Sequence, residues 1–91
     1  MQSYRYARRT MGGQDMIIVI FEGPYCGSVP TIEDRDRIQA AAQRAGISGI
    51  LILVWQFQQG FRYFGPAAWA SAVESLTWES IKSSADEILL A

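Results

Sequence analysis

The residues with the greatest capacity for chemistry lie together in the segment 22–28, Glu-Gly-Pro-Tyr-Cys-Gly-Ser. Cys26 is the only cysteine of the chain, and its thiolate could act as a nucleophile. Glu22 lies where a predicted strand ends, so its carboxylate could be partly removed from water and act as a general acid or base. Ligands commonly bind where parallel strands end. Cys26 and Glu22 are therefore the candidate catalytic residues.

A Pro-Tyr-Cys unit follows a predicted hydrophobic strand here, in the residues Phe21, Pro24, Tyr25 and Cys26. This arrangement resembles the strand-to-loop transition of glutaredoxin-like proteins, and the resemblance implies thiol redox chemistry at Cys26. Position 23 is glycine where that family has its first thiol, and no second cysteine can resolve a mixed disulfide. The predicted helix also begins later than Cys26. A small thiol-dependent redox protein or enzyme is thus one alternative function.

The composition removes several other classes of chemistry. The chain has no histidine, which is the commonest general base and the commonest metal ligand. The glycine spacing fits neither the P-loop nor the dinucleotide-binding fingerprint. Glu33, Asp34 and Asp36 fall in the first turn of a predicted helix, where negative charge complements the helix dipole. We therefore infer no metal site and no cofactor. Because no complete catalytic set of residues is recognisable, a non-catalytic protein is favoured.

Aromatic side chains are dense in the second half of the sequence. They could line a pocket for a small apolar ligand or form a self-complementary interface. Because 49% of the residues are hydrophobic in a chain of 91, some apolar surface should remain outside the core, which favours a homodimer. The candidate ligand or interface residues are Tyr25, Trp55, Phe57, Phe61, Tyr63, Phe64, Trp69 and Trp78.

Tyrosine and arginine alternate near the N-terminus, as Tyr4, Arg5, Tyr6, Arg8 and Arg9. Proteins that bind single-stranded nucleic acid interleave aromatic and basic side chains in this way. The same arginines would also protect an exposed edge strand from aggregation. All nine acidic residues lie beyond residue 10 and would repel a polyanion, so nucleic-acid binding is the less favoured alternative.

The hydrophobic pattern predicts an α+β fold, with a mixed three- to four-stranded sheet and helices mainly on one face. The predicted order of elements is β-β-α-β-β-α-α. Residues 3–10 could form an edge strand, or residues 1–15 a flexible arm. The apolar runs 16–21 and 50–57 predict central parallel strands, joined by a crossover helix over 32–45.

Capping signals define the ends of the helices. Thr31 and Asp34 predict a capping box, and Gly46 a left-handed cap. The inward positions of this helix would be Ile32, Ile38, Ala41, Ala42 and Ala45, with Glu33 and Arg37 paired on the wet side.

Residues 61–64 should form an edge strand, which Arg62 would protect, after a turn at 58–60. A helix beginning near Pro66 should break between 75 and 78, with Thr77 as the next cap. Ile81, Ala85, Ile88 and Leu89 would lie on the apolar face of a last, docked helix.

The chain is expected to form one domain over residues 1–91. A lone cysteine excludes an internal disulfide and favours a reducing compartment, so we expect a cytoplasmic protein. The longest apolar runs are far shorter than the roughly 20 residues that a membrane-spanning helix needs, so no membrane association is expected.

Overall fold

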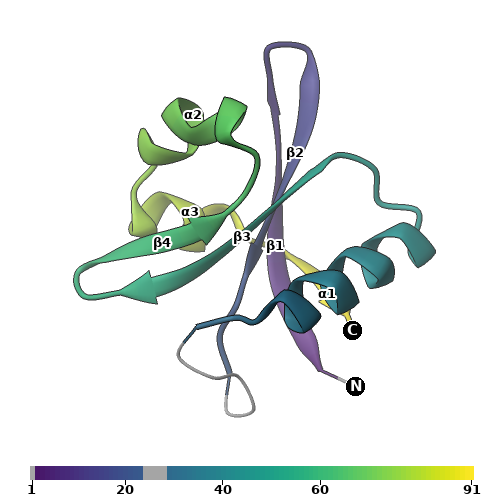
Figure 1. Ribbon diagram of the computed structural model, residues 1–91. Helices are drawn as coiled ribbons and strands as arrows, with labels where there is room; N and C mark the ends of the chain where they lie inside the picture. Colours follow the sequence, from purple (N-terminus) through teal and green to yellow (C-terminus); the bar gives the residue numbers. More distant parts are fainter. Residues whose placement is uncertain (1, 24–28) are drawn as a thin grey trace.

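The computed structural model describes residues 2–23 and 29–91, and in these residues it contains one five-stranded mixed sheet (Figure 1). The strands are β1 (Ser3–Met11), β2 (Gln14–Ile20), β3 (Ile50–Phe57), β4 (Gly60–Phe64) and β5 (Glu87–Leu90). The helices are α1 (Ile32–Arg44), α2 (Ala70–Glu74) and α3 (Trp78–Ser84), with a 3-10 turn, η1 (Ala67–Trp69), before α2. The order across the sheet is β4-β3-β2-β1-β5. The α+β class is as predicted, but the sheet has five strands where three or four were expected, because the chain forms the additional strand β5 after α3.

The centre of the sheet is the parallel pair of β2 and β3, which the crossover helix α1 joins as predicted. Met16 pairs with Ile50 and Ile20 with Val54. Every residue from Met16 to Ile20 is buried, because both faces of these apolar strands are covered. Gly49 precedes β3 with φ 138°, and a Cβ atom there would lie 3.0 Å from the Asp15 carbonyl oxygen, so this close approach requires glycine.

Helix α1 begins with the predicted capping box. The Asp34 N–H donates to the Thr31 hydroxyl at 3.1 Å, and the Thr31 N–H donates to the Asp34 carboxylate at 2.9 Å. The hydrogen bond from Thr31 holds the pKa of Asp34 below its ordinary value, and the Arg37 guanidinium contributes less. The prediction of a Glu33–Arg37 ion pair is wrong. Arg37 pairs with Asp34 at 3.2 Å instead, because its guanidinium is also drawn to the Tyr4 hydroxyl of β1, to which it donates a hydrogen bond.

The buried side of α1 is shorter than predicted. Ile38, Ala41 and Ala42 pack on the sheet, as expected. Ile32 and Ala45 are exposed instead, since the two ends of the helix extend past the residues that contact the sheet.

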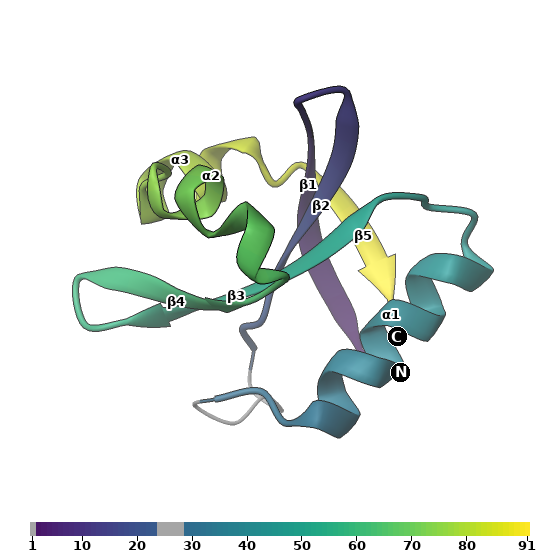
Figure 2. The ribbon, with the colours of Figure 1, turned by 45° about the horizontal axis from the view of Figure 1, so that its top comes forward.

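Helices cover both faces of the sheet, so the expectation of helices mainly on one face is wrong (Figure 2). The physical reason is that β2 and β3 are apolar at successive positions, and such strands need cover on each side. The core under α1 consists of Tyr4, Tyr6, Ile17, Val19, Phe21, Ile38, Ala41, Ala42, Leu53, Trp55 and Leu89. The core under α2 and α3 consists of Ala7, Met16, Ile18, Ile20, Ile52, Val54, Val73, Trp78, Ile81 and Ala85.

The C-terminal residues form a strand rather than the end of a helix. The predicted break is present, with α2 ending at Glu74 and Thr77 capping α3 through Ser80. After Ala85, however, the chain becomes extended, and β5 pairs antiparallel with β1. The prediction failed because the spacing of Ile81, Ala85 and Ile88 also fits a helix.

This pairing also corrects the prediction for the N-terminal residues. β1 lies between β2 and β5, so it is an interior strand, neither an edge nor a flexible arm. No helix in the described part of the chain is long and apolar enough to cross a membrane.

Candidate functional site

The segment with the candidate catalytic residues is described only in part. Tyr25 and Cys26 lie outside the described residues. The Glu22 carboxylate is 2.6 Å from Nη2 of Arg5, and its side chain is 46% exposed. Glu22 is therefore an ion-paired surface carboxylate, without the removal from water that an acid–base role would require.

The N-terminal tyrosines belong to the core. Tyr4 is 1% and Tyr6 4% exposed. The Tyr4 ring stacks on Phe21, with centroids 6.2 Å apart, and its hydroxyl accepts a hydrogen bond of 2.8 Å from Arg37. This hydrogen bond raises the pKa of Arg37. The two rings therefore have no open face on which a nucleic-acid base could stack.

The N-terminal arginines have partners within the fold. Arg5 pairs with Glu22, and Arg8 pairs with Glu87 at 3.3 Å. Nη2 of Arg9 donates to the Ser84 hydroxyl at 3.4 Å. These contacts tie β1 to its neighbouring elements and give each of the three arginines a partner within the fold.

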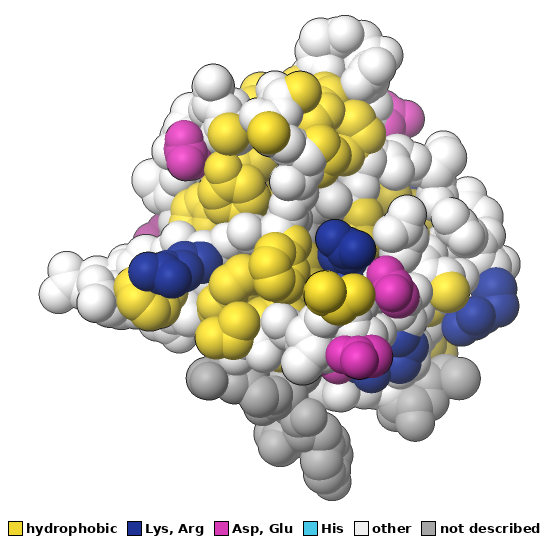
Figure 3. Space-filling view, viewed as in Figure 1, with side chains coloured by type: hydrophobic (Ala, Val, Ile, Leu, Met, Phe, Trp, Pro, Cys, Tyr) yellow, Lys and Arg dark blue, Asp and Glu magenta, His cyan; other side chains and the backbone are white. Residues whose placement is uncertain are grey.

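The predicted aromatic residues come together on the β3–β4 hairpin, where strand alternation divides them between two sides. Trp55, Phe57 and Phe64 share the α1 side with Arg62, and the Trp55 and Phe64 rings are 5.1 Å apart. Phe61 and Tyr63 lie on the α2–α3 side, where Phe61 stacks on Trp78 with centroids 6.3 Å apart. Figure 3 shows apolar side chains exposed along this hairpin, with basic side chains beside them.

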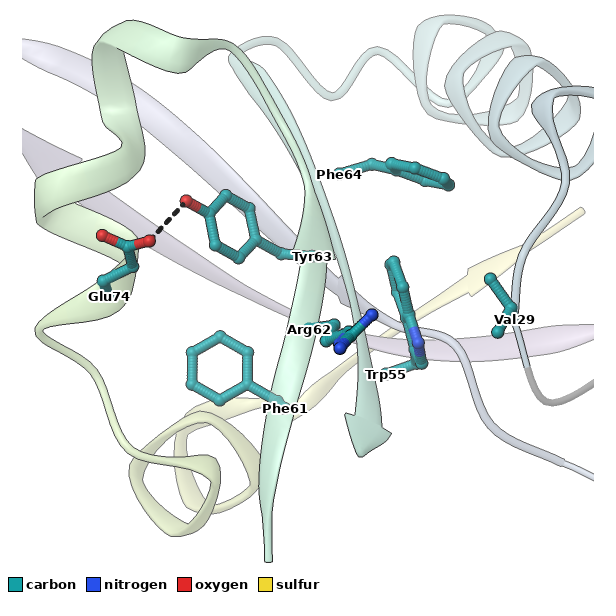
Figure 4. Close-up of a pocket in the computed structure, with 7 residues that line it drawn as sticks. All are labelled: Val29, Trp55, Phe61, Arg62, Tyr63, Phe64 and Glu74. Carbon is teal, nitrogen blue, oxygen red and sulfur yellow. Dashed lines mark hydrogen bonds between the residues drawn. The ribbon is translucent and has the colours of Figure 1, made fainter. Parts of the chain in front are cut away.

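A hollow of about 600 Å³ lies at the outer edge of this hairpin (Figure 4). Residues from both sides of β4 line it, so the hollow wraps around the strand rather than opening on one face. We call it the hairpin hollow. Its lining residues are Val29, Trp55, Phe61, Arg62, Tyr63, Phe64 and Glu74.

On the α1 side, the hairpin hollow offers the exposed Arg62 guanidinium as a hydrogen-bond donor. The Arg62 guanidinium lies 3.9 Å from the centroid of the Phe57 ring, and no carboxylate pairs with it among the described residues. Nε1 of Trp55 is buried, again without a hydrogen-bond partner in the described part of the chain. An unpaired buried donor costs about 1–3 kcal/mol. The protein covers Trp55 Nε1, so it is the exposed Arg62 guanidinium that suits this side to a group that accepts hydrogen bonds.

On the α2 side, the polar groups satisfy one another. The Tyr63 hydroxyl donates to the Glu74 carboxylate at 3.4 Å. Burial, followed by the charge of Glu74, raises the pKa of Tyr63 above its ordinary value. Figure 4 places this pair across β4 from Arg62 and Trp55. Both sides of the hollow are aromatic, but the α1 side carries the cation Arg62 and the α2 side the anion Glu74.

No known family, curated protein or solved structure gives a significant match to this chain. The candidate site is therefore defined by geometry. In the described residues, no group of three or more His, Cys, Asp or Glu side chains is arranged to hold a metal ion.

The hairpin hollow contains part of the aromatic set predicted from the sequence. Trp78 is buried in the core and Trp69 is half-buried away from the hollow, so neither lines it. Val29, Arg62 and Glu74 line the hollow but were not among the predicted site residues. One feature of the sequence could have pointed to Arg62, because it is a single charged residue between two aromatic residues, Phe61 and Tyr63, of a predicted edge strand.

Proposed function

We propose that this protein is a non-catalytic binding module that holds its ligand in the hairpin hollow. The observation that carries the proposal is the aromatic lining of the hollow, since Phe61, Tyr63 and Phe64 remain only half-buried on an open strand. Binding sites combine such apolar walls with a few polar groups, and Arg62 provides one here. A function by acid–base catalysis has less support, because Glu22 is ion-paired and exposed.

The test uses an environment-sensitive apolar dye, 8-anilinonaphthalene-1-sulfonate, whose fluorescence rises in apolar pockets. We expect the dye to bind the folded protein and the Phe64→Ala variant to lose most of the enhancement. Ile32→Ala is the matched control, since Ile32 is an exposed apolar side chain that does not line the hollow. Equal dye fluorescence in the wild type and both variants would contradict the proposal.

Self-association through β5 is a second candidate function. β5 is the other open edge of the sheet, and Ile88 and Leu90 are each 58% exposed there. If two copies paired antiparallel about Leu89, each Ile88 would lie opposite the second copy's Leu90 on the same face. Exposed apolar edge strands favour pairing of this kind.

Light scattering across a dilution series tests the homodimer. We expect a mass of twice 10.2 kDa for the wild type and a monomer for Ile88→Lys. Ile32→Lys, which places the same charge on an exposed apolar position away from β5, should remain dimeric. A wild-type monomer at all concentrations would remove this candidate and leave the hairpin hollow unaffected.

A further inference from the structure

We infer that the ligand of the hairpin hollow is an extended peptide that pairs with β4 as an added strand and places an acidic side chain beside Arg62. This inference rests on the proposed binding function and specifies the chemistry of the ligand. It depends on three features of β4: its open edge, the alternation of its side chains and the unpaired charge of Arg62.

β4 has a hydrogen-bonding partner strand on one side only. It is the terminal strand of the sheet, and within the described residues no backbone hydrogen bond joins Gly60–Phe64 to any element other than β3. Alternate N–H and C=O groups of an edge strand face outward, and an extended peptide can pair with them. The backbone therefore provides affinity that is independent of the peptide sequence.

The side chains of β4 would set the specificity. A peptide strand would lie about 4.8 Å from β4, with its side chains alternating between the two sides of the sheet. The residue beside Arg62 would point to the α1 side, and its two neighbours would point to the side of Phe61 and Tyr63. A hollow that wraps around β4 fits an occupant with side chains on both sides better than a compact small molecule.

The charges of the hollow select an apolar-acidic-apolar pattern. Arg62 has no acidic partner among the described residues, so an acidic side chain on its side would form a favourable cross-strand pair. Glu74 already accepts a hydrogen bond from Tyr63 on the other side and would repel an acid there. A basic side chain opposite Arg62 would be repelled in the same way.

The experiment titrates the full chain with short blocked peptides and follows backbone amide signals by NMR. The first peptide has Val-Glu-Val at its centre and the second has Val-Lys-Val. We expect the acidic peptide to bind about fivefold or more tightly than the basic one, with signal changes concentrated at residues 57–64. Arg62→Glu should reverse this preference. Arg44→Glu, which makes the same charge change at the far end of α1, should preserve it.

Two N-methylated versions of the acidic peptide test the backbone pairing. One carries the methyl groups on odd residues and the other on even residues, so only one set of blocked N–H groups would face β4. We expect one version to lose binding and the other to retain it. Equal binding of both versions would overturn strand pairing.

The remaining outcomes separate this inference from the proposed function. Dye binding that Phe64→Ala abolishes, without binding of any peptide, would overturn the peptide and leave the binding module standing. Signal changes at β5 instead of β4 would assign the peptide to the wrong edge and overturn the inference. Loss of both dye and peptide binding would overturn the inference and the proposed function together.

Discussion

β1 and the β3–β4 hairpin have similar compositions, but they differ in how far their aromatic rings are buried and in whether their arginines have acidic partners. Both interleave aromatic residues with arginine. In β1 the Tyr4 and Tyr6 rings are buried and each arginine has a partner, whereas in the hairpin Phe57 is exposed and Arg62 has no acidic partner among the described residues. Each segment also has one buried donor without a hydrogen-bond partner among the described residues, Nε of Arg9 in β1 and Nε1 of Trp55 in the hairpin. What separates the structural segment from the candidate site is therefore the burial of the aromatic rings and the pairing of the charges, not composition.

The order of the strands explains the difference. β1 has a neighbouring strand on each side, and α1 covers the face that carries its tyrosines. β4 is the last strand of the sheet, so its outer edge and its aromatic side chains remain accessible.

The largest difference in the free energy of unfolding should appear between the variants Tyr4→Ala and Phe57→Ala. Removal of the buried Tyr4 ring leaves a cavity beside Phe21 and should lower the free energy of unfolding by about 3–5 kcal/mol. Phe57 is 38% exposed, so its removal should cost about 1 kcal/mol or less. Urea unfolding of both variants measures the difference, and equal losses would contradict the contrast.

The second test compares two tryptophans of nearly equal burial. Trp55 is 5% and Trp78 6% exposed, but only Trp55 has a buried Nε1 atom without a hydrogen-bond partner in the described residues. Trp55→Phe removes that unpaired donor and should therefore cost about 1–3 kcal/mol less than Trp78→Phe. The same unfolding assay compares the two variants. A greater loss for Trp55→Phe would show that the indole N–H is satisfied in solution.

The third test uses acid to weaken the capping box of α1, the helix that packs on the face of β1 with the two tyrosines. Because the folded state lowers the pKa of Asp34, this carboxylate stabilises the protein above its unfolded pKa of about 4, and its contribution disappears as the pH falls through the folded pKa. Asp34→Ala should cost about 0.5–2 kcal/mol at neutral pH. Unfolding measured down the acid range should show a smaller loss for the variant than for the wild type. If the stability of the variant and of the wild type fell equally as the pH was lowered, the stabilising role of the Asp34 carboxylate would be contradicted.

The smallest effects concern the arginines. The Arg5–Glu22 pair is exposed, so Arg5→Gln should lower stability by up to about 1 kcal/mol, and high salt should reduce the difference. Arg62→Gln should lower stability by less than about 1 kcal/mol, because it removes the contact with the Phe57 ring but no ion pair among the described residues. Chemical unfolding at low and high ionic strength checks both variants. A larger loss for Arg62→Gln would give Arg62 a structural role.

Local signals made much of the fold predictable. The continuous apolar runs identified β2 and β3, and Thr31 with Asp34 identified the start of α1, since these features depend on neighbours in sequence. β5 was missed because its pairing with β1 joins distant parts of the chain, and a single sequence does not reveal that contact.

The candidate site was predictable only in part, for a related reason. Trp55 and Phe64 stood out as aromatic residues, and both line the hairpin hollow. The sequence could not show that Arg62 would lack a partner while Arg5 and Arg8 would have one. That distinction depends on which strands lie beside each arginine.

The pairing of β1 with β5 has a consequence for the order of folding. Backbone hydrogen bonds of 2.8 Å join Gln2 and Ala91, so the closing contact of the sheet spans nearly the whole sequence. Contacts of such long sequence separation carry a large entropic cost and slow folding. During synthesis, β1 gains its second neighbour only after β5, about 80 residues later in the sequence, has emerged from the ribosome. Until then, the edge of the sheet that it presents is open to pairing with other chains.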